Sequence, residues 1–520
     1  MARILLINPV VREEDVPRHI PYGEALLAAI AIKEGHQVAV YDANAWRQGW
    51  DQLAQACRAD AWDVIAIGGL TTTYNFIKQA CRIAKAAAPD SYLIAGGGFL
   101  TSMPSEILEW LPEIDLGIVG EAFKTWPEVL KKVDDKDFDF SKTLGVIWRS
   151  KDGPILNDTR PVIHDLDSLP FPAWDLFPLE EVYFKNSSSL FSEDAYLAQR
   201  RIDVNGSYGC SLICRYCWHL GTTGDMLTQK RPGTNQNDVV FTYGRNIRYH
   251  SPGYIVEMVG RLKRDYAIDF ANFLDENLMT MEASSGRKWL GQICDEWSKA
   301  GLVPVRGKSP QPGVFWSGTS HASLARSDTL DRMYRAGCTH LVYGLESFDP
   351  DILGNLGKGT NRQNNIDSVG ICMSTGIIPI PNIIIGFPDE TIQSIRNTIT
   401  ALIELGIHAK PHFATAYPGS EWYYSYKDSI KEQYNGNLED YIKDLGDATK
   451  ITATISHNFT GVELLGLQEI VAKRDLRLLD QFERVWKPRE ALVQKKESFN
   501  FKAKKINGPK EIPIKVMEAA

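Results

Sequence analysis

The sequence predicts an α/β protein: a doubly wound, Rossmann-like parallel sheet, then a partial (β/α)6 barrel of the TIM type, then a C-terminal helical segment. Short β-rich apolar runs alternate with helix-length segments, which is typical of parallel sheets. A connector with two prolines at residues 166–175 interrupts the alternation, which then resumes. Because 520 residues suffice for two or three separate cores, we expect domains at 1–140 and 196–425, a linker at 141–195, and a C-terminal helical domain and tail at 426–520.

The first series supplies the strands of the N-terminal sheet, which we expect at residues 4–7, 38–41, 64–67, 92–95 and 116–119. Ligands of such sheets bind beyond the carboxyl ends of the strands. The residues there combine hydroxyls, which can hydrogen-bond a ligand, with glycines, which let a ligand approach the backbone. Glycines at strand ends are also ordinary turn residues, so both interpretations stay open. The candidate ligand contacts are Thr71, Thr72, Thr73, Gly96, Gly97, Gly98, Gly120 and Glu121.

The second series predicts the barrel strands at residues 202–207, 268–274, 314–318, 340–345, 378–385 and 412–417. The active site of a (β/α) barrel lies at the carboxyl ends of its strands. A loop with three cysteines follows the first of these strands directly. We therefore expect the chemistry of this protein at the cysteine loop.

Cys210, Cys214 and Cys217 are separated by three and two residues. Three thiolates can bind three irons of a 4Fe-4S cluster and leave the fourth iron open. Zinc is an alternative, but a structural zinc site needs four ligands, and His219 follows Cys217 too closely for the usual spacing. A disulfide or redox pair of Cys214 and Cys217 is another. The other cysteines are scattered and are expected in apolar cores: Cys57, Cys81, Cys294, Cys338 and Cys372.

The charge balance and the N-terminus limit the class of protein. Lysine and arginine number 57 against 65 acidic residues, a formal charge of −8, which argues against a nucleic-acid surface over the whole protein. No apolar stretch approaches the roughly 20 residues of a membrane span. Residues 1–8 read as a strand rather than a signal peptide. We therefore expect a cytoplasmic protein, where thiols favour metal ligation over disulfides.

Several short motifs in a fixed order carry a resemblance to a known family. The cysteine loop resembles the cluster motif of the radical S-adenosylmethionine superfamily. Further matching segments follow at the ends of later barrel strands: 273–277, 344–347, 386–391 and 417–420. The N-terminal part is similar to a cobalamin-binding domain in the segments 8–9, 21–23, 42–43, 96–101 and 120–121. Residues 1 to about 420 thus resemble the cobalamin-dependent radical S-adenosylmethionine enzymes.

The resemblance implies a set of cofactor contacts. Cys210, Cys214 and Cys217 would bind the cluster, and the threonines, glycines and Glu121 named above would contact cobalamin. Carboxylates suit the ammonium and ribose groups of S-adenosylmethionine, although capping or loop solvation is the alternative for them. The implied S-adenosylmethionine contacts are Gly344, Glu346, Ser347, Asp275, Glu276, Gly386, Ala416 and Tyr417. Trp218 either shields the cluster or belongs to the core.

The chain also departs from common family patterns. It has no Asp-x-His-x-x-Gly motif, so we expect cobalt with water or nothing as its lower ligand. Leu100 and Ser211 stand where relatives often carry histidine and proline, and His321 lies near a frequent arginine. These differences concern the subgroup and the substrate rather than the cofactors.

The function implied by the resemblance is a C-methyltransferase. A 5′-deoxyadenosyl radical would abstract hydrogen from an unactivated carbon, and methylcobalamin would supply the methyl group. One alternative is a radical cyclase or rearrangement enzyme that resembles the anaerobic tetrapyrrole cyclase, and another is a non-enzymatic cobalamin or cluster sensor or carrier. Expected partners are a small-molecule or natural-product substrate and an external one-electron donor of the flavodoxin or ferredoxin type. The sequence assigns no catalytic residue.

Two segments have no assigned role. Residues 219–251 exceed a compact connection and contain Arg231, Arg245, Arg248 and His250, which predicts either a lid or binding loop or a surface excursion. The lysine-rich residues 495–515 are expected to form a solvated tail.

Overall fold

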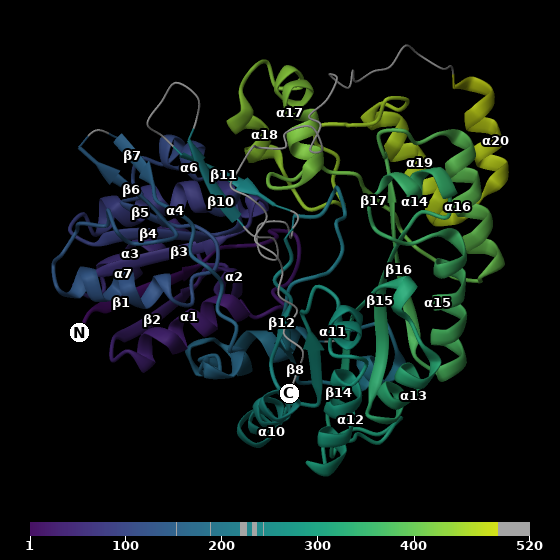
Figure 1. The fold of residues 1–520 in the computed structure, drawn as a ribbon, viewed down its shortest axis with the longest axis horizontal. Coiled ribbons are helices and arrows are strands. Elements are labelled where there is room, and N and C mark those ends of the chain that lie inside the picture. The colour runs from purple at the N-terminus through teal and green to yellow at the C-terminus, as the bar shows by residue number, and fades with distance from the viewer. Residues whose placement is uncertain (152, 188, 219–225, 231–236, 243, 487–520) are drawn as a thin grey trace, which may run out of the picture.

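The computed structural model describes residues 1–486 apart from 152, 188, 219–225, 231–236 and 243. Figure 1 shows two sheets with the chain passing from the purple and blue N-terminal sheet to the teal and green one, and the yellow-green C-terminal helices above them. The predicted tail at 495–515, His219 and Arg231 lie outside the described residues.

The N-terminal sheet has the strand order β2-β1-β3-β4-β5-β6-β7. Its first five strands are parallel and confirm the predicted ones: β1 (Arg3–Asn8), β2 (Gln37–Asp42), β3 (Val64–Gly69), β4 (Tyr92–Gly97) and β5 (Leu116–Ile118). The sheet is completed by an antiparallel pair that the sequence did not predict, β6 (Val146–Ser150) and β7 (Gly153–Leu156). This hairpin lies within the stretch expected as linker.

Helices cover both faces of this sheet, as its doubly wound topology requires. One side carries the packed pair α1 (Tyr22–Lys33) and α7 (Thr125–Asp134), and the other carries α3 (Trp50–Arg58) and α4 (Tyr74–Ala87). Short elements follow the strands: α2 (Ala43–Trp46), η1 (Thr71–Thr73), α5 (Gly98–Ser102) and α6 (Pro104–Trp110).

The connector between the two sheets packs against the N-terminal domain. Ala173 N donates to Ala25 O on α1 (2.9 Å), and the buried Tyr183 hydroxyl donates to Asp42 Oδ2 (2.6 Å). Its short elements are η2 (Leu166–Ser168), η3 (Trp174–Leu176), η4 (Leu179–Tyr183), η5 (Phe184–Asn186) and α8 (Glu193–Leu197). These contacts fix the position of the barrel relative to the first sheet.

The second sheet is an open half-barrel with the order β17-β16-β15-β14-β13-β8, in which sequential strands are neighbours and parallel. It confirms the six predicted strands: β8 (Arg201–Val204), β13 (Phe270–Phe273), β14 (Phe315–Ser320), β15 (Cys338–Glu346), β16 (Ile378–Ile385) and β17 (His412–Phe413). The helices between them are α10 (Pro252–Tyr266), α11 (Leu278–Ser284), α12 (Trp289–Lys299), η6 (Ala322–Leu324), α13 (Ser327–Arg335), α14 (Pro350–Asn355), α15 (Arg362–Thr375) and α16 (Ile392–Glu404).

The long connection at 219–251 packs on the first sheet where the structure describes it. The antiparallel pair β10 (Met226–Lys230) and β11 (Asn237–Phe241) contacts β7 and α6, and Asn237 Nδ2 donates to Leu156 O (2.8 Å). A second pair joins β9 (Ser207–Tyr208) to β12 (Arg248–Tyr249). The described part of the connection thus covers the edge of the N-terminal sheet.

The C-terminal segment is helical, as predicted, and bridges the two domains. α18 (Leu438–Asp444) packs on α4 of the first domain, where the Tyr74 hydroxyl donates to Glu439 Oε1 (2.8 Å). α19 (Gly461–Lys473) and α20 (Leu476–Val485) pack on α16 of the barrel, and α17 (Glu421–Gln433) precedes α18. In the part of the chain that the structure describes, no helix has the length and apolar character needed to cross a bilayer.

Candidate active site

The entry into the cysteine loop is held by two acidic side chains at the end of β13. The fully buried Asp275 accepts hydrogen bonds from Gly206 N (3.0 Å) and from the Ser207 hydroxyl, and Glu276 accepts one from Gly209 N (3.2 Å). Burial raises the pKa of Asp275 to about 7. Two of the three carboxyl groups predicted to contact S-adenosylmethionine therefore bind the backbone that leads into the loop.

The rest of the cysteine loop contacts all three parts of the molecule. The Tyr216 hydroxyl donates to Glu346 Oε1 (2.8 Å) in the barrel, and Trp218 Nε1 donates to the Ser102 hydroxyl (2.5 Å) on α5 of the first domain. Arg215 O accepts from Trp422 N (3.1 Å) at the start of α17. The loop thus lies where the N-terminal domain, the barrel and the C-terminal segment meet.

The donor set of the loop fits a 4Fe-4S cluster. Burial raises the pKa of the Cys214 thiol, the neighbouring Cys217 and Cys210 raise it further, and Lys358 opposes them. Bound iron would supply the positive charge that a thiolate needs there. Within the described residues, no three His, Cys, Asp or Glu side chains are placed to hold one metal ion together. Zinc needs its ligands around a single point, whereas a 4Fe-4S cluster binds each of the three cysteines through a different iron.

A cavity of about 340 Å³ lies beside Tyr216 and Glu346. Glu346 ends β15 with a φ of 60°, and its carboxylate forms a buried ion pair with Lys358, which also donates to Gly344 O (2.6 Å). The full lining consists of Arg12, Tyr216, Glu346, Asn382, Ile384, His412, Asp447, Ala448 and Thr449. The cavity therefore opens at the carboxyl ends of β15, β16 and β17, where a barrel places its ligands.

Asn382 and His412 are among the polar residues of this cavity that were not predicted from the sequence. Asn382 sits between apolar residues in β16, at the partly exposed position that alternates with buried Ile383. A lone amide at an inward-facing position of an apolar strand is a usable signal. His412 pairs in register with Ile384, a relation that only the folded sheet reveals.

Other predicted S-adenosylmethionine contacts form hydrogen bonds within the protein. Gly386 N donates to the buried Glu390 carboxyl, whose pKa burial raises to about 8. Ala416 O accepts from the Tyr441 hydroxyl (2.8 Å), and the hydroxyls of Ser347 and Thr398 are 3.2 Å apart. Of the predicted set, Glu346 lines this cavity and Tyr417 lines the larger one described next.

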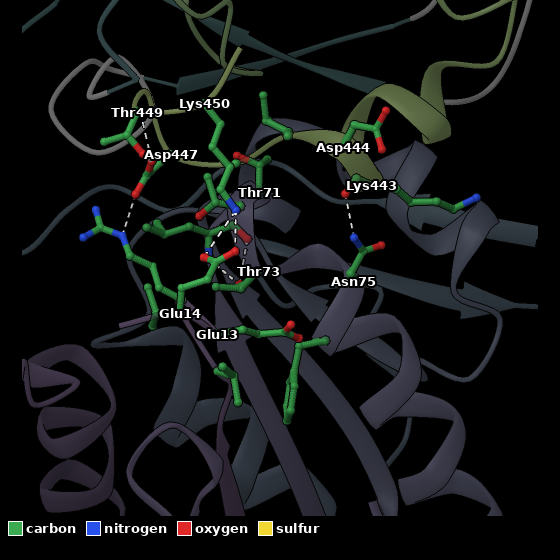
Figure 2. Close-up of a pocket in the computed structure, with 18 of the residues that line it drawn as sticks. Glu13, Glu14, Thr71, Thr73, Asn75, Lys443, Asp444, Asp447, Thr449 and Lys450 are labelled. Atoms are coloured by element: carbon green, nitrogen blue, oxygen red, sulfur yellow. Dashed lines mark hydrogen bonds and ion pairs between the residues drawn. The ribbon is translucent and has the colours of Figure 1, made fainter. Parts of the chain in front are cut away.

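A larger cavity, of about 620 Å³, lies between the carboxyl end of β3 and residues 443–450. Figure 2 shows Thr71 and Thr73 on one side and Asp447, Thr449 and Lys450 on another. Thr71, Thr72 and Thr73 line it, whereas Gly96, Gly97, Gly98, Gly120 and Glu121 do not, and the contacts of all eight with cobalamin stay a prediction. Trp218 of the cysteine loop also lines it.

The glycines after β4 serve close packing. Gly97 has a φ of +91°, and a Cβ there would lie 2.6 Å from Gly69 O of the neighbouring strand. A Cβ on Gly98 would lie 2.7 Å from the Trp218 ring. Glu121 is paired with Arg248 (2.6 Å) and accepts from Ile163 N (2.8 Å). These contacts fit the turn and packing interpretation, while the contact of these residues with a ligand stays a prediction.

Ion pairs cross the larger cavity. Arg12 Nε lies 2.6 Å from Asp447 Oδ2. Lys450 Nζ lies 3.0 Å from Glu14 Oε1 (Figure 2). Arg12 lines both cavities, and so do Asp447 and Thr449. The two cavities are therefore adjacent.

Comparisons with known proteins agree with this arrangement. The chain matches the model of the B12 binding domain at residues 10–130 and that of the radical SAM superfamily at residues 204–402. An uncharacterized methyltransferase of Pyrococcus horikoshii is 25% identical over 438 residues, which cover 83% of this chain and 84% of the relative. An anaerobic magnesium-protoporphyrin IX monomethyl ester cyclase of Rubrivivax gelatinosus is 22% identical over 67% of this chain and 55% of the cyclase.

Among solved structures, the fold is similar to that of TsrM from Kitasatospora setae, a radical S-adenosylmethionine methyltransferase with cobalamin and a 4Fe-4S cluster bound. The TM-score is 0.63 at 15% identity, and the match covers 83% of this chain and 78% of TsrM. The two family models fall on the two sheets, and the cysteine loop and both cavities lie at their junction. The chain belongs to the cobalamin-dependent radical S-adenosylmethionine enzymes.

Proposed function

We propose that this enzyme transfers a methyl group from cobalamin to a carbon atom of a small-molecule substrate. One observation carries the proposal: the cysteine loop borders both cavities, the smaller through Tyr216 and the larger through Trp218. Such a loop brings a cluster, S-adenosylmethionine and cobalamin within reach of one substrate. The methyltransferase relative from Pyrococcus horikoshii supports this reaction.

The residues divide between the cofactors as follows. Cys210, Cys214 and Cys217 hold the cluster, the smaller cavity beside Glu346 binds S-adenosylmethionine, and the larger cavity beside Thr71 binds cobalamin. When bound, these groups supply a deoxyadenosyl radical and a transferable methyl group. We also propose the domain division 1–140, 141–195, 196–425 and 426–520, with the β6–β7 hairpin as an extension of the first sheet.

The chain's own side chains position these ligands. Asn382 offers both a donor and an acceptor and Glu346 an anionic acceptor, and together they suit the amino and hydroxyl groups of S-adenosylmethionine. Thr71 and Thr72 offer hydroxyls to the amide side chains of cobalamin. No histidine occurs among the described residues that line the larger cavity. That cobalt has water or nothing as its lower ligand stays a prediction from the sequence.

The second candidate is a radical cyclase with the same cofactors, which the cyclase relative favours. Product mass distinguishes the two reactions. We expect an anaerobic reaction with candidate metabolites, reductant and methyl-deuterated S-adenosylmethionine to give a product heavier by one labelled methyl group. Loss of hydrogen or gain of a water-derived oxygen would instead identify the cyclase. Cofactor uptake without any cleavage of S-adenosylmethionine would contradict both enzymes and favour a sensor or carrier.

The ion pairs across the larger cavity predict how tightly cobalamin is retained. In Lys450→Ala we expect cobalamin to dissociate faster, because the contact with Glu14 that spans the cavity is lost. Exposed pairs contribute about 0.2–1 kcal/mol, so the effect is at most about fivefold. The release of cobalamin into excess competitor, followed by absorbance, measures it. Lys299→Ala removes an equally exposed pair on α12 and should leave the release rate unchanged.

A further inference from the structure

The loop between β1 and α1, residues 9–21, lines both cavities and contacts the first barrel strand. Its residues Val10 to Asp15 line the larger cavity, and Arg12 lines the smaller cavity as well. Farther along, His19 Nδ1 lies 2.9 Å from Asp203 Oδ2 on β8, inside the barrel domain. One loop of the cobalamin domain therefore reaches from both cofactor cavities to the first barrel strand.

His19 and Asp203 differ sharply in exposure. The Asp203 side chain is 2% exposed, whereas the His19 ring is 62% exposed. In the described part of the chain, no hydrogen bond is found at Nε2 of His19. The ring is thus held through Nδ1, and Nε2 is left to bind a ligand beside the ring.

Asp203 is itself fixed by a row of polar side chains across neighbouring strands. Asn272 Nδ2 donates to Asp203 Oδ1 (2.7 Å), and the Ser317 hydroxyl donates to Asn272 Oδ1 (3.0 Å). These three residues are register partners on β8, β13 and β14. Both carboxylate oxygens are therefore engaged, one by Asn272 and one by His19, so the imidazole orientation is set by the sheet.

The inner face of this sheet is accessible, unlike the filled interior of a closed barrel. Asn272, Thr319, Val342 and Asn382 are partly exposed, while residues that alternate with them, among them Leu341 and Ile383, are buried. Asn382 also lines the proposed S-adenosylmethionine cavity. A substrate on the inner face would thus lie beside the S-adenosylmethionine cavity.

The charges around His19 favour its protonated form. Asp203 raises the pKa of His19 by charge attraction and by its hydrogen bond, against the partial desolvation of the ring and the repulsion of Arg201 and Arg12. Burial acts to raise the pKa of Asp203, but His19, Arg201 and Asn272 together hold it below its usual range. Arg18 adds a further positive charge near Arg201.

We propose that His19 is a substrate-binding residue, whose Nε2–H, oriented by Asp203, donates a hydrogen bond to a carboxylate or phosphate group of the substrate. This rests on the proposed function, because the substrate has to lie between the two cofactors. A purely structural tie between the domains would bury the ring, and here most of it is open. Arg12 and Arg18 on the same loop supplement its charge.

The test observes His19 directly in the protein loaded with cobalamin and cluster. Histidines are labelled with 13C at Cε1, and His19→Gln identifies the His19 signal. Sodium acetate and inorganic phosphate then serve as probes. We expect a saturable shift of the His19 signal below its pKa, and in Asp203→Asn a lower His19 pKa with binding about tenfold weaker, the loss of one charge-assisted hydrogen bond. His164, which is exposed, is the control and should show no saturation.

A His19 signal that stays still, or that moves linearly as that of His164 does, would overturn the proposal. Cleavage of S-adenosylmethionine, measured on the same sample, keeps the two proposals apart. If S-adenosylmethionine is cleaved but the His19 signal does not respond to the probes, only the binding role of His19 is rejected. If the His19 signal shifts with saturation but S-adenosylmethionine is not cleaved, only the methyltransferase is rejected. If Asp203→Asn fails to fold, Asn272→Ala, which removes one of the two hydrogen bonds of Asp203, replaces it, again with weaker anion binding as the expected result.

Discussion

Alanine at Cys210, Cys214 and Cys217 together is expected to remove iron, labile sulfide and all formation of deoxyadenosine. The three thiols are the proposed cluster ligands, and without the cluster no electron reaches S-adenosylmethionine. Cobalamin should stay bound, because the larger cavity is lined mainly by residues of the N-terminal domain and the C-terminal segment. Iron analysis, the visible spectrum and chromatography of the reaction under reducing conditions measure these three properties.

The matched control replaces three cysteines outside the loop, Cys57, Cys294 and Cys372, which are buried in helices of both domains. This variant should keep its iron and its deoxyadenosine formation. Persistent deoxyadenosine in the loop variant, or loss of iron in the control, would show that the cluster ligands are assigned wrongly.

Lys358→Met is expected to lower the free energy of unfolding by about 3–5 kcal/mol, the cost of leaving one partner of a buried ion pair uncompensated. The side chains of Lys358 and Glu346 are 7% and 6% exposed, and Lys358 also donates to Gly344 O. Without the lysine, Glu346 retains the Tyr216 hydroxyl as its partner. Denaturant unfolding, followed by circular dichroism, measures the change.

Two further variants test the cause. The double variant Glu346→Gln, Lys358→Met removes both charges, so its loss of stability should be smaller than the sum of the two single losses. Lys299→Met removes an exposed lysine paired with Glu296 and should leave the free energy of unfolding nearly unchanged. Additive single losses would contradict an energetic coupling between Lys358 and Glu346.

The strands and the cysteine loop could be predicted because their signals are local. Apolar runs such as Ile378–Ile385 show their strand character in the sequence itself. The spacing of the cysteines and the position of Glu346 at a strand end were equally readable. The β6–β7 hairpin was missed because its strands, of five and four residues, carry little periodic pattern.

The contacts of the site were less predictable because they join distant residues. Asp275 reaches back 69 residues to Gly206, and Glu121 reaches 127 residues to Arg248. A carboxylate at a strand end has the same appearance in a sequence whether it binds a ligand or a backbone amide. Arg12 and His412 line the same cavity although they lie far apart in the sequence, so only the fold brings them together.

The hydrogen bonds around the cysteine loop also bear on how the enzyme matures. Gly206, Gly209 and Tyr216 are bound by carboxylates of the protein itself, so these contacts need no metal. We therefore expect this loop, unlike a zinc finger, to fold before its metal arrives. Cells starved of iron should accumulate a folded precursor that becomes competent once iron and sulfide are delivered.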